Sequence, residues 1–365
     1  MALQIGIVGL PNVGKSTVFN ALTGAEAEVA SYPFTTITPN VGVAEVPDER
    51  LHNIAAIVVP ERVVPTSIEF LDVAGLVKGA SQGEGLGNQF LGHIRDADAI
   101  AMVVRCFRNP EIPHVTEALN PRDDIETVNL ELTLADLTTV ERRLEKVRRD
   151  IKGRKGGYEA ELDLLSRLHD HLSAGSVARG FLLGAEEEGM LRDLRLLTKK
   201  PMLYIANVGE EDLPGGGSLA GAVAQVARAE GVESVAICAK LEAELADWTP
   251  AEAQAYRAEL GLEKSAIQQL IKASYSLLNL ITFFTTTGGR EVRAWTVQRG
   301  TRAPEAAGKV HSDMQRGFIR AEVLSYADLM AAGSFPTARQ RGVLRLEGKD
   351  YLVQDGDIIH FRFSV

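Results

Sequence analysis

Cysteine is scarce in this chain, which has only Cys106 and Cys238 among its 365 residues. Each closes an apolar, strand-like run, and neither has another cysteine or a histidine at the spacing of metal ligands. We therefore expect two reduced thiols in the core rather than a disulfide or a metal site. Hydrophobic runs are short as well, and none approaches the length of a membrane span. We expect no signal peptide, because the first apolar segment belongs to the motif described below.

A basic excess is missing too, since 49 acidic residues oppose 39 lysines and arginines and leave a net charge of −10. This balance argues against a protein that coats nucleic acid with its whole surface. Residues 142–155 are an exception, with eight basic and two acidic residues, a local charge of +6. This basic patch is either a solvated helix face or a surface that binds a phosphate-rich partner such as RNA.

A phosphate-binding loop stands near the start of the chain. The apolar run 4–8 leads into Gly9-Leu10-Pro11-Asn12-Val13-Gly14-Lys15-Ser16-Thr17, the pattern G-x-x-x-x-G-K-[ST] between a buried-type strand and a helix. The two glycines let backbone N–H groups converge on phosphate oxygens, and the helix dipole favours the same anion. Lys15 is expected to reach the β- and γ-phosphates and Ser16 to bind Mg²⁺. The loop predicts that Asn12–Thr17 bind a nucleoside triphosphate.

Alternating strand-like and helical segments predict an α/β fold, a P-loop NTPase with a mostly parallel sheet. The strand-like runs are 4–8, 41–46, 67–71, 99–106, 202–206 and 234–238, with helical patterns at 14–22, 87–94 and 219–229. The interval 107–201 is too long for a single crossover.

The middle of this interval predicts an inserted helical hairpin. Apolar residues with coiled-coil spacing occur before and after a glycine-rich break at 153–157, and they are Leu137, Val140, Leu144, Val147, Ile151, Leu162, Leu165, Leu168 and Leu172. From residue 279 onward, short β-type runs at 280–285, 292–296, 319–323, 343–346 and 358–363 predict a β-rich module with a net charge of +3. We expect a nucleotide-binding domain at 1–127 and 200–278, the hairpin at 128–199 and the C-terminal module at 279–365.

Two further motifs fit a nucleotide hydrolase. A loop at 32–40 holds adjacent threonines, Thr35 and Thr36, and Asp72-Val73-Ala74-Gly75 follows the strand 67–71 as a D-x-x-G switch. Asp72 can hold a water on Mg²⁺, and the Gly75 N–H can meet the γ-phosphate.

The residue after this switch is Leu76, where Ras-type GTPases carry the glutamine that orients water. Hydrolysis is then either slow or served by another group. His114 has a suitable intrinsic pKa for that role, but the sequence alone favours a histidine in a surface loop. The Asn12 amide oxygen can help to coordinate a monovalent cation such as K⁺ beside the phosphates.

Base recognition is expected after the strand 202–206. The guanine motif N-K-x-D appears there as Asn207-Val208-Gly209-Glu210, with valine in place of lysine and glutamate in place of aspartate. Because the guanine clamp is altered twice, we predict relaxed or adenine-favouring specificity. Cys238-Ala239-Lys240 is the expected second base loop, with Ala239 and Lys240 bordering the purine.

Together these segments closely resemble one family, the YchF-type Obg-like ATPases of the translation-factor class of GTPases. The matching segments are 9–17, 32–40, 72–87, 105–115, 207–210 and 237–242, and the resemblance spans nearly the whole chain. The C-terminal runs EVRAWT at 291–296, GFIRAEV at 317–323 and EGKDYLVQDGDIIHFRF at 347–363 resemble a TGS domain, a ubiquitin-like α+β module.

The resemblance implies slow, Mg²⁺-dependent ATP hydrolysis with GTP also bound, and stimulation by K⁺ through Asn12. It places Mg²⁺ on Ser16 and Thr36, a backbone contact to the base at Val208 and the water-positioning role on His114. It also implies the ribosome as partner. From the short apolar runs and the reduced cysteines we expect no membrane binding and a cytoplasmic location, and we further expect a monomer that does not bind DNA. An Obg-type GTPase acting in ribosome assembly and a non-catalytic, nucleotide-dependent module that binds the ribosome or RNA are the alternatives.

Overall fold

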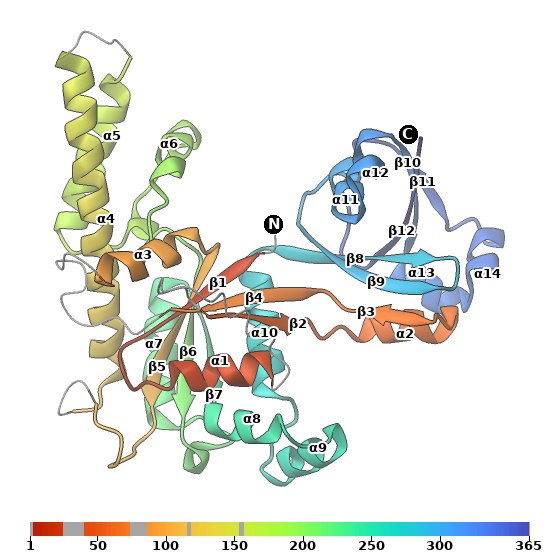
Figure 1. Cartoon of the computed structure of the whole chain (residues 1–365), viewed down its shortest axis with the longest axis horizontal. Coiled ribbons are helices and arrows are strands. Elements are labelled where there is room, and N and C mark those ends of the chain that lie inside the picture. Colours follow the sequence, from red (N-terminus) through yellow and green to blue (C-terminus); the bar gives the residue numbers. More distant parts are fainter. Residues whose placement is uncertain (1–2, 25–39, 74–85, 115–117, 153–156, 365) are drawn as a thin grey trace. The chain divides into compact units, whose positions relative to one another are not determined.

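The computed structural model describes residues 3–24, 40–73, 86–114, 118–152 and 157–364 (Figure 1). Its contacts divide the chain into two compact units. The first unit comprises residues 1–43 and 69–270, and the second comprises residues 44–68 and 271–365. No helix among these described residues is long and apolar enough to cross a membrane.

The first unit is built on a six-stranded sheet with the order β2-β4-β1-β5-β6-β7. These strands are β1 (Gln4–Val8), β2 (Asn40–Glu45), β4 (Ser67–Asp72), β5 (Ala99–Cys106), β6 (Met202–Val208) and β7 (Glu233–Ile237). The strand pairs from β4 to β7 are all parallel. Every residue of β5 and β6 is buried, as expected for central strands covered on both faces. The α/β prediction with a mostly parallel sheet is confirmed.

Helices connect these strands and continue beyond the last one. They are α1 (Lys15–Thr23), α3 (Leu86–Asp96), α7 (Gly217–Glu230), α8 (Ala239–Leu245) and α9 (Pro250–Glu259), followed by α10 (Ala266–Leu277), within which the chain passes into the second unit. At the start of α9, the Thr249 side chain accepts from the Glu252 N–H and the Glu252 carboxylate accepts from the Thr249 N–H, which is a capping box. Pro250 holds the first helical position. The phosphate loop joins β1 to α1 at the carboxyl edge of the parallel strands, the usual place for ligands in such sheets.

The predicted helical hairpin is present in the first unit as α4 (Pro121–Lys152) and α5 (Glu159–Ser173), which lie side by side (Figure 1). Val140, Leu144 and Val147 of α4 pack in one cluster with the buried leucines of α5. The short helix α6 (Ala185–Leu191) follows. Helix α4 begins at Pro121, earlier than the predicted boundary at residue 128, so its first turns belong to the nucleotide-binding part of the fold.

Asp136 ties α4 to the segment that precedes β6. Its carboxylate accepts from the Leu197 N–H at 2.7 Å, the Thr198 N–H at 2.8 Å and the Thr198 hydroxyl at 2.7 Å. Burial raises the pKa of this carboxyl, and the hydrogen bonds from Thr198 and Leu197 oppose that rise. The two ends of the inserted hairpin are thereby joined at its base.

The second unit has its own six-stranded sheet, with the order β11-β10-β12-β8-β9-β3. Its strands are β3 (Arg62–Val64), β8 (Leu280–Thr287), β9 (Glu291–Gln298), β10 (Phe318–Ser325), β11 (Arg345–Glu347) and β12 (Asp357–Phe363). Its helices are α2 (Glu49–Val58), α11 (Ala303–Val310), α12 (Ser312–Arg316), α13 (Tyr326–Ala332) and α14 (Phe335–Gln340). The five C-terminal strand segments were all predicted, whereas helices were implied only by the resemblance to an α+β module and their positions were not predicted.

The segment 44–68 departs from the expected domain division. Its strand β3 pairs in parallel with β9, and its helix α2 contributes Leu51 and Ile54 to the core of the second unit. Arg50 at the start of α2 also binds Asp355 by two hydrogen bonds, at 2.9 and 3.2 Å. Residues 44–68 were expected in the nucleotide-binding domain, and this expectation was wrong. Their own sequence contains no signal that β3 pairs with a strand more than two hundred residues later in the chain.

Candidate nucleotide-binding site

Two glycines allow the phosphate loop to curl tightly against its neighbours. Gly14, the N-cap of α1, has φ of 87°, a left-handed conformation that favours glycine. A Cβ atom there would lie 2.2 Å from Asn207 Nδ2, and a Cβ atom on Gly9 would lie 2.6 Å from the carbonyl oxygen of Val103. The loop is therefore packed closely enough that neither position has room for a side chain.

Lys15, Ser16 and Asp72 gather where the loop enters α1. The Lys15 ammonium forms an ion pair with Asp72 Oδ1, and the Ser16 hydroxyl donates to Asp72 Oδ2 at 3.2 Å. The side chains of Lys15 and Asp72 are each 11% exposed, so this ion pair is largely shielded from water. The structure thus brings the predicted phosphate lysine and two predicted Mg²⁺ residues together.

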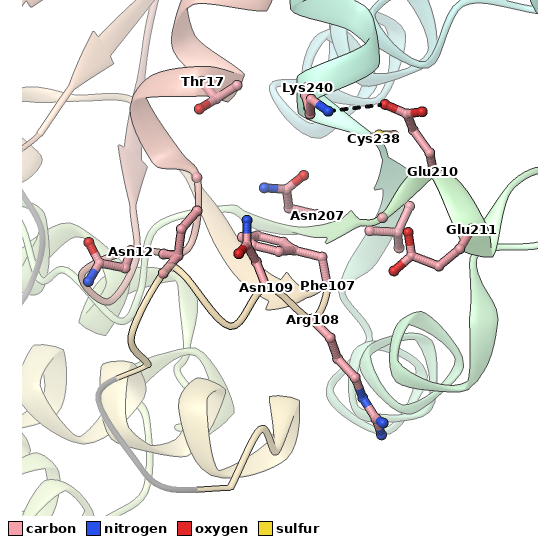
Figure 2. A pocket seen from close by; sticks show the side chains of 14 residues that line it. Asn12, Thr17, Phe107, Arg108, Asn109, Asn207, Glu210, Glu211, Cys238 and Lys240 are labelled. Carbon is pink, nitrogen blue, oxygen red and sulfur yellow. Dashed lines mark ion pairs between the residues drawn. The ribbon is translucent and has the colours of Figure 1, made fainter.

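A cavity of about 530 Å³ opens beside the loop (Figure 2). The loop contributes Asn12, Gly14 and Thr17 to its lining, and Val208, Glu210 and Lys240 line it from the segments after β6 and β7. These six residues were all predicted to contact the nucleotide. Val13, Lys15, Ser16 and Ala239 do not line this cavity, since Lys15 and Ser16 face Asp72 and the other two are buried.

Asn207 connects the two predicted base-binding segments to the phosphate loop. Its Nδ2 donates to the Val13 carbonyl at 2.9 Å, and its Oδ1 accepts from the Ala239 N–H at 3.1 Å. The residue is 5% exposed. Its amide atoms are therefore engaged by backbone groups, although the residue also lines the cavity.

Glu210 and Lys240 form an ion pair with 3.7 Å between Oε1 and Nζ, drawn as a dashed line in Figure 2. Lys240 also lies 3.8 Å from Glu244. Cys238 is buried at this end of the cavity, and burial raises the pKa of its thiol. The segment expected to be the second base loop therefore lies at this end of the cavity, with Lys240 paired to Glu210 and Glu244.

Sequence reasoning missed the wall formed by the residues after β5. Phe107, Arg108, Asn109 and Ile112 line the cavity opposite the base loop, and Figure 2 shows Phe107 and Asn109 beside Asn207. Glu211 also lines it. The aromatic residue directly after the buried strand β5 was the available signal for this wall of the cavity.

Arg105 holds the backbone of this wall in place through hydrogen bonds from its guanidinium. The residue is 3% exposed, and its guanidinium donates to the carbonyl oxygens of Phe107, Asn109, Ile112, Pro113 and Asn12 at 3.0–3.4 Å. It also lies 4.5 Å from the Phe107 ring centroid. Burial lowers the pKa of Arg105. One buried cation thus holds the loop 107–113 against the phosphate loop; an arginine in the otherwise apolar run of β5 was the signal in the sequence.

His114 follows this loop, and it is not a surface histidine. Its side chain is 8% exposed, and its Nε2 lies 3.1 Å from Asp124 Oδ1 in the first turn of α4. Burial raises the pKa of Asp124, while the charge and hydrogen bond of His114 oppose that rise. The residue before it, Pro113, contacts the phosphate loop, since its carbonyl accepts from Asn12 Nδ2 at 3.1 Å.

Asn12 has a left-handed backbone with φ of 63°, and its Nδ2 is engaged by Pro113. Its amide oxygen is the atom predicted to help hold K⁺. Thr36 and Gly75, predicted to bind Mg²⁺ and the γ-phosphate, lie outside the described residues, as do Thr35 and Leu76. Among the described residues there is no group of three or more histidine, cysteine or acidic side chains that could hold a metal ion.

Two family models match the chain. The model MMR_HSR1, described as "50S ribosome-binding GTPase", matches residues 4–144. The model YchF-GTPase_C, described as "Protein of unknown function (DUF933)", matches residues 280–364.

Similar proteins match over the full length. "Ribosome-binding ATPase YchF" of Bacillus subtilis (strain 168) is 52% identical, and the protein of the same name from Escherichia coli O157:H7 is 49% identical; each alignment covers 100% of both chains. The solved "Structure of the Schizosaccharomyces pombe YchF GTPase" is 34% identical with a TM-score of 0.85, over 99% of this chain and 97% of that chain. By sequence and by fold, the chain belongs to the YchF family.

Proposed function

We propose that this chain is a ribosome-binding ATPase, the activity printed in the names of its relatives. The observation that carries the proposal is the pairing of Lys15 and Ser16 with Asp72 beside a cavity that ends in an altered guanine motif. The group of Lys15, Ser16 and Asp72 suits the triphosphate of any nucleotide. The altered motif suits adenine better than guanine, because neither Val208 nor the longer Glu210 reproduces the clamp that guanine requires.

Mg²⁺ is the divalent ion that fits this site. A hydroxyl and a carboxylate 3.2 Å apart at the start of α1 are hard oxygen donors, which Mg²⁺ prefers. Ser16 and Thr36 would hold the ion, and Asp72 would hold one of its waters. When bound, Mg²⁺ supplies positive charge beside the β- and γ-phosphates.

The residues of this chain then have separable roles in hydrolysis. Lys15 leaves Asp72 and binds the phosphates, while the backbone N–H groups of the loop and of Gly75 surround the anion. His114 orients the attacking water and accepts its proton, a role that Leu76 cannot fill. The Asn12 amide oxygen would help to hold K⁺, which would supply positive charge near the developing negative charge. Without a glutamine after the switch, we expect slow turnover.

Ribosome binding is assigned to the basic patch 142–155 and to the C-terminal module. Arg142, Lys146, Arg148 and Arg149 are exposed on α4, where they can contact phosphate oxygens of ribosomal RNA. We assign residues 279–365 to a TGS domain and the pair α4–α5 to a coiled-coil hairpin. We expect a cytoplasmic monomer that does not bind DNA or membranes, with GTP as a second nucleotide.

Single-turnover hydrolysis of ATP and GTP tests the catalytic part of this proposal. We expect tighter binding of ATP than of GTP, faster hydrolysis in K⁺ than in Na⁺, and a loss of about a hundredfold in rate in His114→Ala. A hundredfold preference for GTP would favour the Obg-type GTPase. No hydrolysis under any condition would favour a non-catalytic binding module, and an unchanged rate in both K⁺ and His114→Ala would refute the mechanism.

Co-sedimentation with ribosomes tests the basic patch. We expect a variant with glutamate at Arg148, Arg149, Arg154 and Lys155 to lose most of its binding, with a steep salt dependence in the unmodified protein. Glutamate at Arg192, Arg195, Arg228 and Lys264, which are exposed on the same unit outside the patch, is the matched control because it reverses the same number of charges. Equal sedimentation of both variants would show that the patch is only a solvated helix face.

A further inference from the structure

His114 and Asp124 form a pair that is more buried than a loop histidine normally is. Their side chains are 8% and 5% exposed, and Nε2 lies 3.1 Å from Oδ1. The second ring nitrogen, His114 Nδ1, and the second carboxylate oxygen, Asp124 Oδ2, are also buried. Neither has a hydrogen-bond partner among the described residues. A buried pair with two unpartnered polar atoms contributes little to the free energy of folding, because the cost of removing these groups from water is only partly compensated by the one contact between them.

With Asp124 ionised, the contact between Nε2 and Oδ1 indicates which ring nitrogen can accept a proton. An ionised carboxylate accepts only, so the neutral imidazole beside Asp124 carries its proton on Nε2. The lone pair is then on Nδ1, the nitrogen that is free of protein partners among the described residues. A general base needs such a nitrogen, and a carboxylate on the opposite side of the ring keeps the imidazole in this tautomer.

The backbone before His114 is held independently of its ring. The Pro113 carbonyl accepts from Asn12 Nδ2 at 3.1 Å and from Arg105 Nη1 at 3.4 Å, which ties the residue before His114 to the phosphate loop. Asp124 holds the ring from the first turn of α4, where its own N–H donates to the Asn120 carbonyl at 3.2 Å. The contacts of Pro113 with Asn12 and Arg105 therefore set the position of the His114 backbone, and Asp124 sets the orientation of the His114 ring.

We propose that Asp124 is the positioning residue of the hydrolytic reaction: it holds the His114 ring through Nε2 and leaves Nδ1 as the acceptor of the proton from the attacking water. This inference rests on the proposed function, in which His114 activates water. The water loses its proton to Nδ1 as its oxygen bonds to the γ-phosphorus, and the bond from that phosphorus to the ADP oxygen breaks. The imidazolium that forms is stabilised by the Asp124 carboxylate.

Asp124→Asn tests this role, with Asp123→Asn as the matched control. Asp123 is the exposed neighbour in the same helical turn, so the control removes the same charge from the same helix end. An asparagine can present its NH₂ group to Nε2 and so favour the wrong tautomer. We expect single-turnover ATP hydrolysis to fall by about tenfold or more in Asp124→Asn, with the ATP dissociation constant within about twofold of the original value. Asp123→Asn should retain the original rate.

The ¹⁵N chemical shifts of the His114 ring give a readout that does not depend on activity. We expect the Nε2–H tautomer in the unmodified protein and a shift toward Nδ1–H in Asp124→Asn. An Nδ1–H tautomer in the unmodified protein would overturn the proposal even if the variant failed to fold. Equal rates in Asp124→Asn and Asp123→Asn would overturn it as well.

Failure of this proposal can be told apart from failure of the proposed function. If His114→Ala is slow while Asp124→Asn is not, His114 is catalytic and Asp124 does not position it. If His114→Ala retains the original rate, the proposed mechanism itself is wrong. If both proposals hold, the double variant should be no slower than His114→Ala alone, because Asp124 acts through the histidine.

Discussion

The side-chain amide of Asn207 joins the phosphate loop to the base loop by donating from Nδ2 to the Val13 carbonyl at 2.9 Å. Its oxygen accepts from the Ala239 N–H at 3.1 Å. Both bonds are buried, where the loss of a partner leaves a polar backbone group without compensation. A single side chain therefore couples the segment that would hold the phosphates to the segment that would border the base.

Asn207→Ala should accordingly weaken nucleotide binding even if Asn207 makes no direct contact with the base. Two buried backbone groups lose their partner, and a cost of about 2–3 kcal/mol corresponds to a loss of roughly thirty- to more than a hundredfold in affinity. Titration of a fluorescent ATP analogue measures this loss. Asn53→Ala in the second unit removes an exposed amide that donates to the Tyr326 hydroxyl, and it should leave affinity unchanged. Equal affinities in the two variants would contradict the bridging role.

The nucleotide preference should respond to restoration of the guanine motif. Val208→Lys together with Glu210→Asp rebuilds N-K-x-D on a strand end that Asn207 already positions. We expect the ratio of GTP to ATP affinity to rise by about tenfold or more, because the shorter carboxylate can accept from guanine N1–H and N2–H₂. Competition titrations with both nucleotides measure the ratio. Glu211→Asp, at the next cavity-lining residue, is the control, and a rise of the same size there would argue against recognition through the motif.

The Lys15–Asp72 ion pair should compete with nucleotide when Mg²⁺ is absent. Because Asp72 holds the lysine that the phosphates require, Asp72→Asn should raise the affinity for ATP in EDTA by several-fold. The same change should weaken the Mg²⁺-dependent gain in affinity, since the carboxylate that orients the metal's water is lost. Titrations with and without Mg²⁺ separate the two effects. Asp96→Asn, whose exposed side chain pairs with Arg195, is the control, and lower affinity of Asp72→Asn in EDTA would contradict the competition.

Much of the fold and of the phosphate site could be predicted because the signals are local. The phosphate loop is a contiguous motif, and apolar runs such as 99–106 identify buried strands of a parallel sheet. The hairpin followed from the spacing of its leucines, which pack as expected in one cluster. Each of these features depends on residues within a few turns of one another.

The features that could not be predicted from the sequence depend on contacts between segments that are distant along the chain. Asp124 could not be distinguished from Asp123 in the sequence, since two acidic residues at a helix start suit the helix dipole equally well. Only the fold brings one of them to His114 and exposes the other. The pairing of β3 with β9 was likewise hidden, because a three-residue strand has no pattern of its own.

In the second unit, Asp355 should make stability depend on pH in the acid range. Burial alone would raise the pKa of Asp355, but hydrogen bonds from Arg50 and from the Thr282 N–H hold it below the usual value of 3.8. A lowered pKa means that the folded state binds the proton less readily than the unfolded chain does. The stabilisation is therefore fully present above the unfolded pKa and is lost as pH falls through the folded one.

Asp355→Asn removes this charge while leaving an oxygen that can accept from Thr282. Near neutral pH, we expect the variant to lose about 1 kcal/mol, a modest value because the Asp355 side chain is 42% exposed and its ion pair with Arg50 is screened. The difference should shrink as pH falls below the usual carboxyl pKa of 3.8 and vanish once Asp355 is protonated in the folded state, where both proteins carry a neutral group. Hydrogen exchange of the β8 amides, including the Thr282 N–H, measures it without requiring two-state unfolding of the whole chain. Asp350→Asn, an exposed change in the same unit, should show no such dependence, and a difference that persisted in acid would assign the effect to packing instead of charge.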